Sequence, residues 1–163
     1  MRIIQKNALL ALMLCAAVVS AQPAPAPLKL SSGTYKFFGE CTRLSVLTNE
    51  FPYQCANYMG IVADDPSLPN FVFFVEGKTW LYRVSGPALF SQDGALATYP
   101  VAEMFDMVVE RKYVYPGQCV MSARIGEPLV RCTMWRDLSH NEITREIEFS
   151  GNGTWMFSRK DDP

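Results

Sequence analysis

Residues 71–84 read FVFFVEGKTWLYRV, and this stretch decides the expected fold. Its first part, 71–75, is a short continuous apolar run of aromatic and β-branched residues, which is typical of a buried strand. After a Glu-Gly-Lys turn, residues 79–84 carry similar side chains. Two such runs joined by a short turn that contains glycine predict an antiparallel hairpin.

Similar runs occur elsewhere in the chain. We expect strands at 34–37, 120–125, 129–135 and 142–149, separated by turns that contain glycine, proline and asparagine. The protein is therefore predicted to be mainly β. About eight antiparallel strands should pack as a sandwich or close as a barrel, because both arrangements limit exposed sheet edges.

The hairpin at 71–84 is the last part of a sequence pattern that occurs twice in the chain. Each copy has Gly-x-Cys, a glutamate five residues before a second cysteine, and Thr-Trp-x-aromatic. The elements are Gly39, Cys41, Glu50, Cys55, Thr79 and Trp80 in one copy, and Gly117, Cys119, Glu127, Cys132, Thr154 and Trp155 in the other. This order predicts two similar four-stranded repeats, 33–85 and 111–160, that arose by internal duplication. The alternative is that β-hairpins reuse such residues anyway.

The connector between the copies spans 86–110. After Pro100, the residues Val101, Met104, Phe105 and Val108 have helical spacing. This spacing predicts a short helix at 101–109, although the same segment also follows a strand period in part.

The N-terminal residues resemble a targeting signal. Basic Arg2 and Lys6 precede an apolar run, and small residues follow up to Ala21. This pattern predicts a secretory signal peptide over 1–21, cleaved after Ala21, with an uncleaved anchor as the alternative. A Pro/Ala-rich tether over 22–32 and a single β domain over 33–163 should follow. We expect no transmembrane segment in the mature chain, and a periplasmic or secreted location.

The cysteines fit this location. The chain has five cysteines, and Cys15 would leave with the signal peptide. An even number in an exported chain favours disulfides, and we expect the local pairs Cys41–Cys55 and Cys119–Cys132. Each pair closes a loop that stabilises the fold by about 3 kcal/mol. We expect no metal site, because the closely spaced cysteine pairs of zinc sites are missing from the sequence.

Composition and motifs narrow the function. The 163 residues include 15 basic and 16 acidic residues. The chain therefore lacks the excess of basic residues that nucleic-acid binding favours. No phosphate-binding loop or dinucleotide fingerprint occurs in the sequence, and we expect no cofactor. The only histidine is His140, in a polar turn. A hydrolase that combines Glu50 or Glu127 with His140 is one alternative, but these residues are more typical of solvated turns.

Two matching sets of aromatic and basic residues are the candidate binding residues: Trp80, Tyr82, Arg83, Trp155, Phe157 and Arg159. They form a recognition surface if they face a cleft, whereas both tryptophans fill the core if they face inward. The sequence favours an exported, non-enzymatic protein that binds a protein or an envelope component, as an inhibitor or assembly factor. The main alternative is a small barrel that carries an apolar ligand in a cavity lined by residues such as Phe71, Phe73, Trp80 and Trp155.

Overall fold

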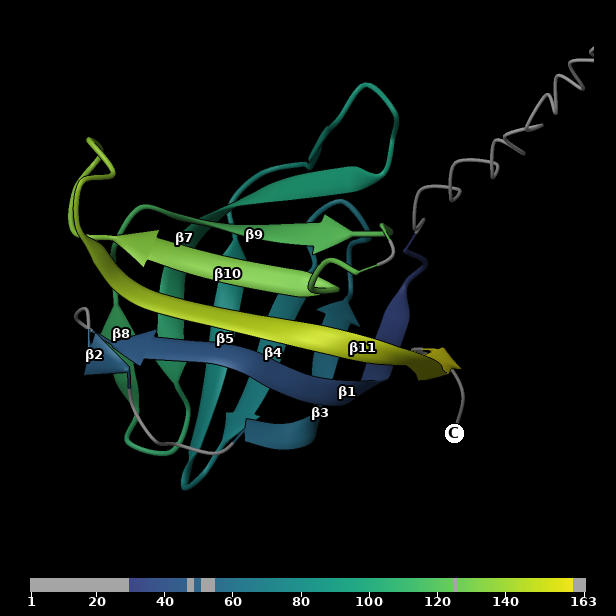
Figure 1. Cartoon of the computed structure of the whole chain (residues 1–163), viewed down its shortest axis with the longest axis horizontal. Coiled ribbons are helices and arrows are strands. Elements are labelled where there is room, and N and C mark those ends of the chain that lie inside the picture. The colour runs from purple at the N-terminus through teal and green to yellow at the C-terminus, as the bar shows by residue number, and fades with distance from the viewer. Residues whose placement is uncertain (1–29, 47–48, 51–54, 125, 160–163) are drawn as a thin grey trace, which may run out of the picture.

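The computed structural model describes residues 30–46, 49–50, 55–124 and 126–159. Within these residues the chain forms a closed antiparallel barrel of eight strands (Figure 1). The predicted signal peptide and residues 22–29 of the predicted tether lie outside the described residues. In the described part of the chain, no helix has the length and apolar character needed to cross a membrane.

The strands follow one another around the wall in chain order, and each pairs with the next. They are β1 (Gly33–Val46), β3 (Cys55–Ala63), β4 (Asn70–Val75), β5 (Lys78–Val84), β7 (Leu96–Asp106), β9 (Gly117–Ser122), β10 (Val130–Trp135) and β11 (Ile143–Arg159). Pairing between β1 and β11 closes the barrel. Three short strands lie beside this wall: β2 (Asn49–Glu50) pairs with β1, while β6 (Leu89–Phe90) and β8 (Arg111–Tyr113) pair with β7. The prediction of a mainly β chain with eight antiparallel strands is confirmed, in the form of a barrel.

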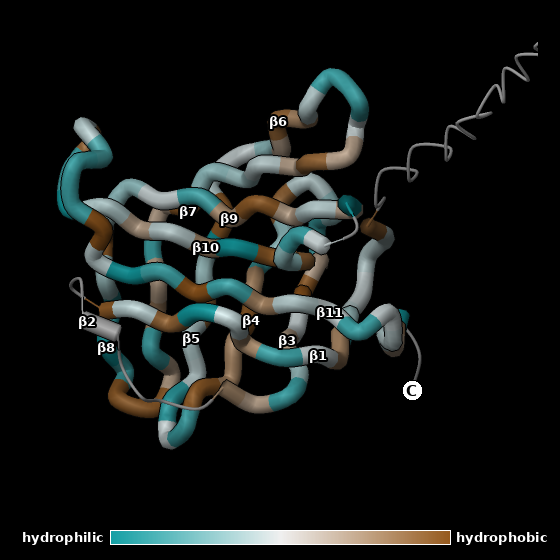
Figure 2. Tube along the Cα trace, viewed as in Figure 1, coloured by the Kyte–Doolittle hydropathy of each residue, from teal (hydrophilic) through white to brown (hydrophobic). Residues whose placement is uncertain are grey.

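Alternating side chains fill the barrel interior. In β4 and β5 the residues Phe71, Phe73, Trp80 and Tyr82 are all buried, which confirms the hairpin predicted at 71–84. Apolar and hydrophilic residues alternate along much of the wall, as the colours of Figure 2 show. Since successive residues of a strand point to opposite faces, this alternation places one set in the core and the other in solvent.

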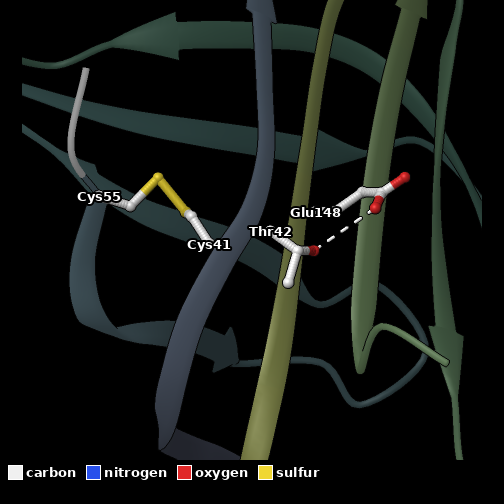
Figure 3. Close-up of a disulfide and its surroundings, with 4 residues drawn as sticks. All are labelled: Cys41, Thr42, Cys55 and Glu148. Atoms are coloured by element: carbon white, nitrogen blue, oxygen red, sulfur yellow. Dashed lines mark hydrogen bonds between the residues drawn. A yellow bond between two sulfur atoms is a disulfide. The ribbon is translucent and has the colours of Figure 1, made fainter. Parts of the chain in front are cut away.

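Ion pairs on the outer face support the seam where the barrel closes. Glu146 of β11 pairs with Arg43 of β1 at 2.9 Å, and Glu148 pairs with Arg131 of β10 at 2.7 Å. Thr42, the extra residue of a bulge in β1, donates a hydrogen bond to Glu148 at 3.4 Å (Figure 3). Glu146 and Glu148 alternate with the core residues along β11 because successive side chains point to opposite faces, and their ion-pair partners lie on both neighbouring strands.

Two disulfides cross-link the wall. Cys41 of β1 is bonded to Cys55 of β3, and Figure 3 shows this bond on the side of β1 away from Thr42. Cys119 and Cys132 are directly opposite each other on β9 and β10, and both are fully buried. Both predicted pairings are confirmed, and two disulfides fit an oxidising compartment.

The helix predicted at 101–109 is wrong, and no helix occurs among the described residues. Residues 96–106 form β7, and a turn follows at 107–110. A bulge at Ala102 makes Arg83 pair with Glu103 and Val84 pair with Val101. Because of this extra residue, the next inward-facing side chain after Val101 is Met104 and not Glu103. One extra residue in a strand therefore produces the i, i+3 spacing that the sequence pattern attributed to a helix.

The two four-stranded repeats are not confirmed. Residues 33–85 supply β1, β3, β4 and β5 to the wall, whereas 111–160 supply β9, β10 and β11, and β7 comes from the connector. Thr79 and Trp80 follow the turn that opens β5, whereas Thr154 and Trp155 lie inside the continuous strand β11. The two Thr-Trp motifs therefore occupy different positions in the fold.

Candidate functional site: an apolar cavity at one end of the barrel

The wall is incomplete at the end where β1 begins and β11 finishes, which we call the cavity end. The ladder between β10 and β11 stops at the pair Val130 and Phe149. Beyond that pair, residues 150–151 and 155–159 of β11 pair with β1 alone. In Figure 1, β11 continues past β10 toward the right of the view. The difference in length between β10 and β11 leaves a gap in the wall.

A cavity of about 590 Å³ occupies this gap. Its apolar lining includes Phe37, Phe90, Ala97, Met121, Leu129 and Trp155. Small residues, among them Gly94, Ala95 and Gly153, border the same space. The cavity exists because small side chains replace the bulky ones that fill the rest of the interior.

Aromatic side chains line one wall of the opening. The ring of Trp155 lies 6.4 Å from that of Phe37 and 6.0 Å from that of Tyr35, and Phe157 lies 4.7 Å from Tyr35, all between ring centroids. Tyr35 and Phe37 are buried, whereas Trp155 remains 54% exposed. Phe90 of β6, another residue that lines the cavity, is 60% exposed. The aromatic wall thus runs from the core out to solvent.

Charged residues also lie at the rim of the cavity. Arg124, in the turn between β9 and β10, pairs with Asp93 at 2.8 Å and with Glu127 at 3.4 Å. Ser122 donates a hydrogen bond to Glu127 at 2.8 Å. We call Asp93, Arg124 and Glu127 the rim cluster. It joins the loop before β7 to the turn between β9 and β10, and it contains two carboxylates and one guanidinium.

Asp93 and Arg124 of the rim cluster stabilise each other in their charged forms. Hydrogen bonds from Ser91 and then from Arg124 and the Ala95 amide lower the pKa of Asp93 below its usual range. The hydrogen bond and charge of Asp93 raise the pKa of Arg124. Both groups therefore remain ionised at neutral pH.

A bulge in β11 borders the cavity. Phe37 pairs with Trp155 and Gly39 pairs with Gly151, so residues 152–154 have no partner on β1. Asn152 accepts a hydrogen bond from the Thr154 amide at 2.9 Å, and Gly153 has a φ of 85°. The sequence Gly151-Asn152-Gly153 is typical of a turn between two strands, but here it forms a bulge within one strand.

The opposite end of the barrel is filled with polar residues. The guanidinium of Arg145, on the inward face of β11, lies 3.9 Å from the ring centroid of Tyr113. Asp106 is also buried there, and it accepts hydrogen bonds from the amides of Val108 and Val109. These contacts fill the interior at this end, so the two ends of the barrel differ in character.

The structure separates the predicted binding residues. Trp80 and Tyr82 lie in the core, and Arg83 pairs with Glu103 at 2.6 Å on the outer face. Trp155 and Phe157 instead lie at the cavity end, and the exposed Arg159 ends β11. The six residues do not form one surface, because β1, β3 and β4 separate β5 from β11 around the wall.

Of the two glutamates in the hydrolase alternative, the structure places Glu127 far from His140. Glu127 lies at the cavity end, whereas His140 lies in the turn between β10 and β11 at the opposite end, where its ring stacks on Trp135 at 4.1 Å. Glu50 is in β2, which pairs with Ser45 and Val46 at the end where His140 lies. Among the described residues, no group of three or more His, Cys, Asp or Glu side chains is arranged to hold a metal ion.

Most of the residues that line the cavity differ from those that the sequence predicted. The expected cavity lining included Phe71, Phe73 and Trp80, which are core residues, and only Trp155 lines the observed space. The available signal was the run of small residues at Gly94, Ala95 and Ala97, next to a strand. Such a run leaves space only if it faces inward, which depends on strand register.

An eight-stranded barrel either fills its interior with side chains or encloses one small ligand, and this barrel combines a filled interior with a cavity at one end. No protein-family model, curated protein or solved structure matches the chain. The class of protein is therefore defined by the architecture and the cavity alone: a small disulfide-bonded β-barrel.

Proposed function

We propose that this chain is a non-enzymatic binding protein that takes an apolar group into the cavity at the cavity end. The observation that carries this proposal is the cavity of about 590 Å³ with an apolar lining and a charged rim. Ligand sites in proteins typically combine such a volume with apolar walls and a few polar groups. The separation of Glu127 from His140 disfavours a hydrolase that uses this pair.

The predicted location belongs to the same proposal. A signal peptide over 1–21 and a tether over 22–32 would deliver the barrel to the periplasm or outside the cell. The two disulfides support this location, since such bonds persist in oxidising compartments. The bound group would come from a protein or an envelope component, and Trp155 and Phe157 would contact it.

Binding of a neutral apolar fluorophore, N-phenyl-1-naphthylamine, tests the cavity. We expect saturable binding to the intact oxidised chain with a rise in the emission of the fluorophore. Ala97→Phe should weaken this binding at least tenfold, because the new ring occupies the cavity. The matched control is Ala102→Phe, on the exposed face of the same strand, which should bind as the unchanged chain does.

The circular dichroism spectrum and urea midpoint of both variants establish that they are folded. Absence of saturable binding to the unchanged chain would contradict the proposal. So would equal affinity of the folded Ala97→Phe and Ala102→Phe variants.

A further inference from the structure

The cavity is bordered by an unpaired strand edge. Residues 150–151 and 155–158 of β11 pair with β1 on one side, with the bulge at 152–154 between them, and no described strand pairs with the other side of residues 150–158. We call this stretch the free edge. A strand edge presents backbone N–H and C=O groups in a row, and these groups are available to another extended chain.

The free edge begins where an existing ladder stops. The last pair between β10 and β11 joins Val130 to Phe149, and Leu129, the residue before β10, lines the cavity. Gly151, Gly153, Thr154 and Trp155 line the cavity from the β11 side. The cavity therefore lies at the position that a longer β10 would occupy.

We propose that the free edge binds an extended peptide segment of a partner protein, which adds a strand beside β11 and inserts an apolar side chain into the cavity. This inference rests on the proposed function and names the class of ligand. In strand addition, the main-chain hydrogen bonds supply affinity, and pockets for alternate side chains supply specificity. The free edge and the cavity provide these two components next to each other.

The side chains around the cavity define the peptide further. The aromatic rings of Phe37, Phe90 and Trp155 suit an aliphatic or aromatic side chain. The rim cluster has two carboxylates and one guanidinium, which leaves one negative charge. A basic residue next to the inserted side chain complements this charge.

Selection from a random peptide library tests the proposal, because it requires no candidate partner. Heptapeptides displayed on phage are panned on the intact oxidised chain, with removal of phage that also bind Ala97→Phe. We expect enriched peptides with alternating apolar residues and a Lys or Arg beside one of them. The selected peptide should displace N-phenyl-1-naphthylamine.

Two N-methylated versions of the selected peptide supply the decisive measurement. One version is methylated at the amides of odd positions and the other at the amides of even positions. Because only one edge of an added strand pairs with its neighbour, one version should bind at least tenfold more weakly and the other should bind as the parent does. Amide hydrogen exchange of residues 150–158 should slow in the complex.

Equal affinities of the two methylated versions would overturn the proposal. Failure to enrich any peptide, while the fluorophore binds, would overturn it and leave the proposed function standing. Failure of both would remove the two together. A dimer in sedimentation measurements that excludes the selected peptide would assign the free edge to a second copy of the chain and would also overturn the proposal.

Discussion

Trp80 and Trp155 show how two regions of one barrel use the same residue type. Trp80 is 3% exposed in the filled interior, whereas Trp155 is 54% exposed beside the cavity. Both follow a threonine, and both face the inner side of the wall. What differs is the neighbouring strand: β5 has β4 and β7 on its two sides, while this part of β11 has only β1. Complete pairing gives a core residue, and incomplete pairing leaves a half-exposed residue that lines the cavity.

The largest expected effect separates the two tryptophans directly. Trp80→Ala should lower the free energy of unfolding by about 3–5 kcal/mol, because it removes a buried indole and leaves a cavity. Trp155→Ala should lower it by about 1 kcal/mol or less, since about half of its surface already contacts water. Urea denaturation of the oxidised variants measures both values.

Ligand binding should show the reverse order. Trp155→Ala should weaken N-phenyl-1-naphthylamine binding although the variant stays folded. Similar losses of stability for the two variants would show that the two regions do not differ as the structure indicates.

A second, smaller effect concerns pH and the filled interior. Burial raises the pKa of Tyr82, and its hydroxyl has no hydrogen-bond partner among the described residues. An unfolded tyrosine loses its proton near pH 10, so above that pH the unfolded state gains stability that the folded state does not. The free energy of unfolding should therefore fall by up to about 1.4 kcal/mol per pH unit above pH 10 from this group alone.

Tyr82→Phe should remove this part of the pH dependence. At neutral pH the variant should be as stable as the unchanged chain or slightly more stable, because no hydrogen bond is lost. Denaturation at several pH values between 7 and about 11 checks both statements. A variant with an unchanged slope would show that Tyr82 ionises while folded.

The smallest effect is expected at the rim of the cavity. Asp93→Asn removes the ion pair with Arg124, which joins two loops that border the cavity. Because this pair is exposed, the dissociation rate of N-phenyl-1-naphthylamine should rise by at most about fivefold. Stopped-flow fluorescence measures this rate.

The control is Glu103→Gln, which breaks an ion pair with Arg83 on the outer face and should leave the rate unchanged. A dissociation rate that is the same in Asp93→Asn and Glu103→Gln would show that the rim does not control access.

Asp93 should also contribute to the pH dependence of stability. Because hydrogen bonds lower the pKa of Asp93, its contribution to stability should be present above pH 4 and be lost as the pH falls further.

Sequence patterns predicted the parts of the fold that depend on interactions between residues close in the chain. The hairpin at 71–84 has a continuous apolar run, β-branched residues and a glycine with a φ of 67° at its turn. The disulfide partners are close in sequence, so each bond closes a short loop within neighbouring strands. In contrast, the bulge at Ala102 depends on the register between β5 and β7, and the pattern of one strand cannot show that register.

The sequence by itself predicted a mainly β chain, the hairpin at 71–84 and the two disulfides, because alternation, glycine positions and cysteine spacing act over short distances. Only the tertiary structure decided that β11 extends past β10, that the Gly-Asn-Gly segment is a bulge, and that a cavity and a free edge result. These features depend on which strands meet across the closed wall. Pairing of β1 with β11 joins the first and last strands of the barrel, so no local pattern contains that information.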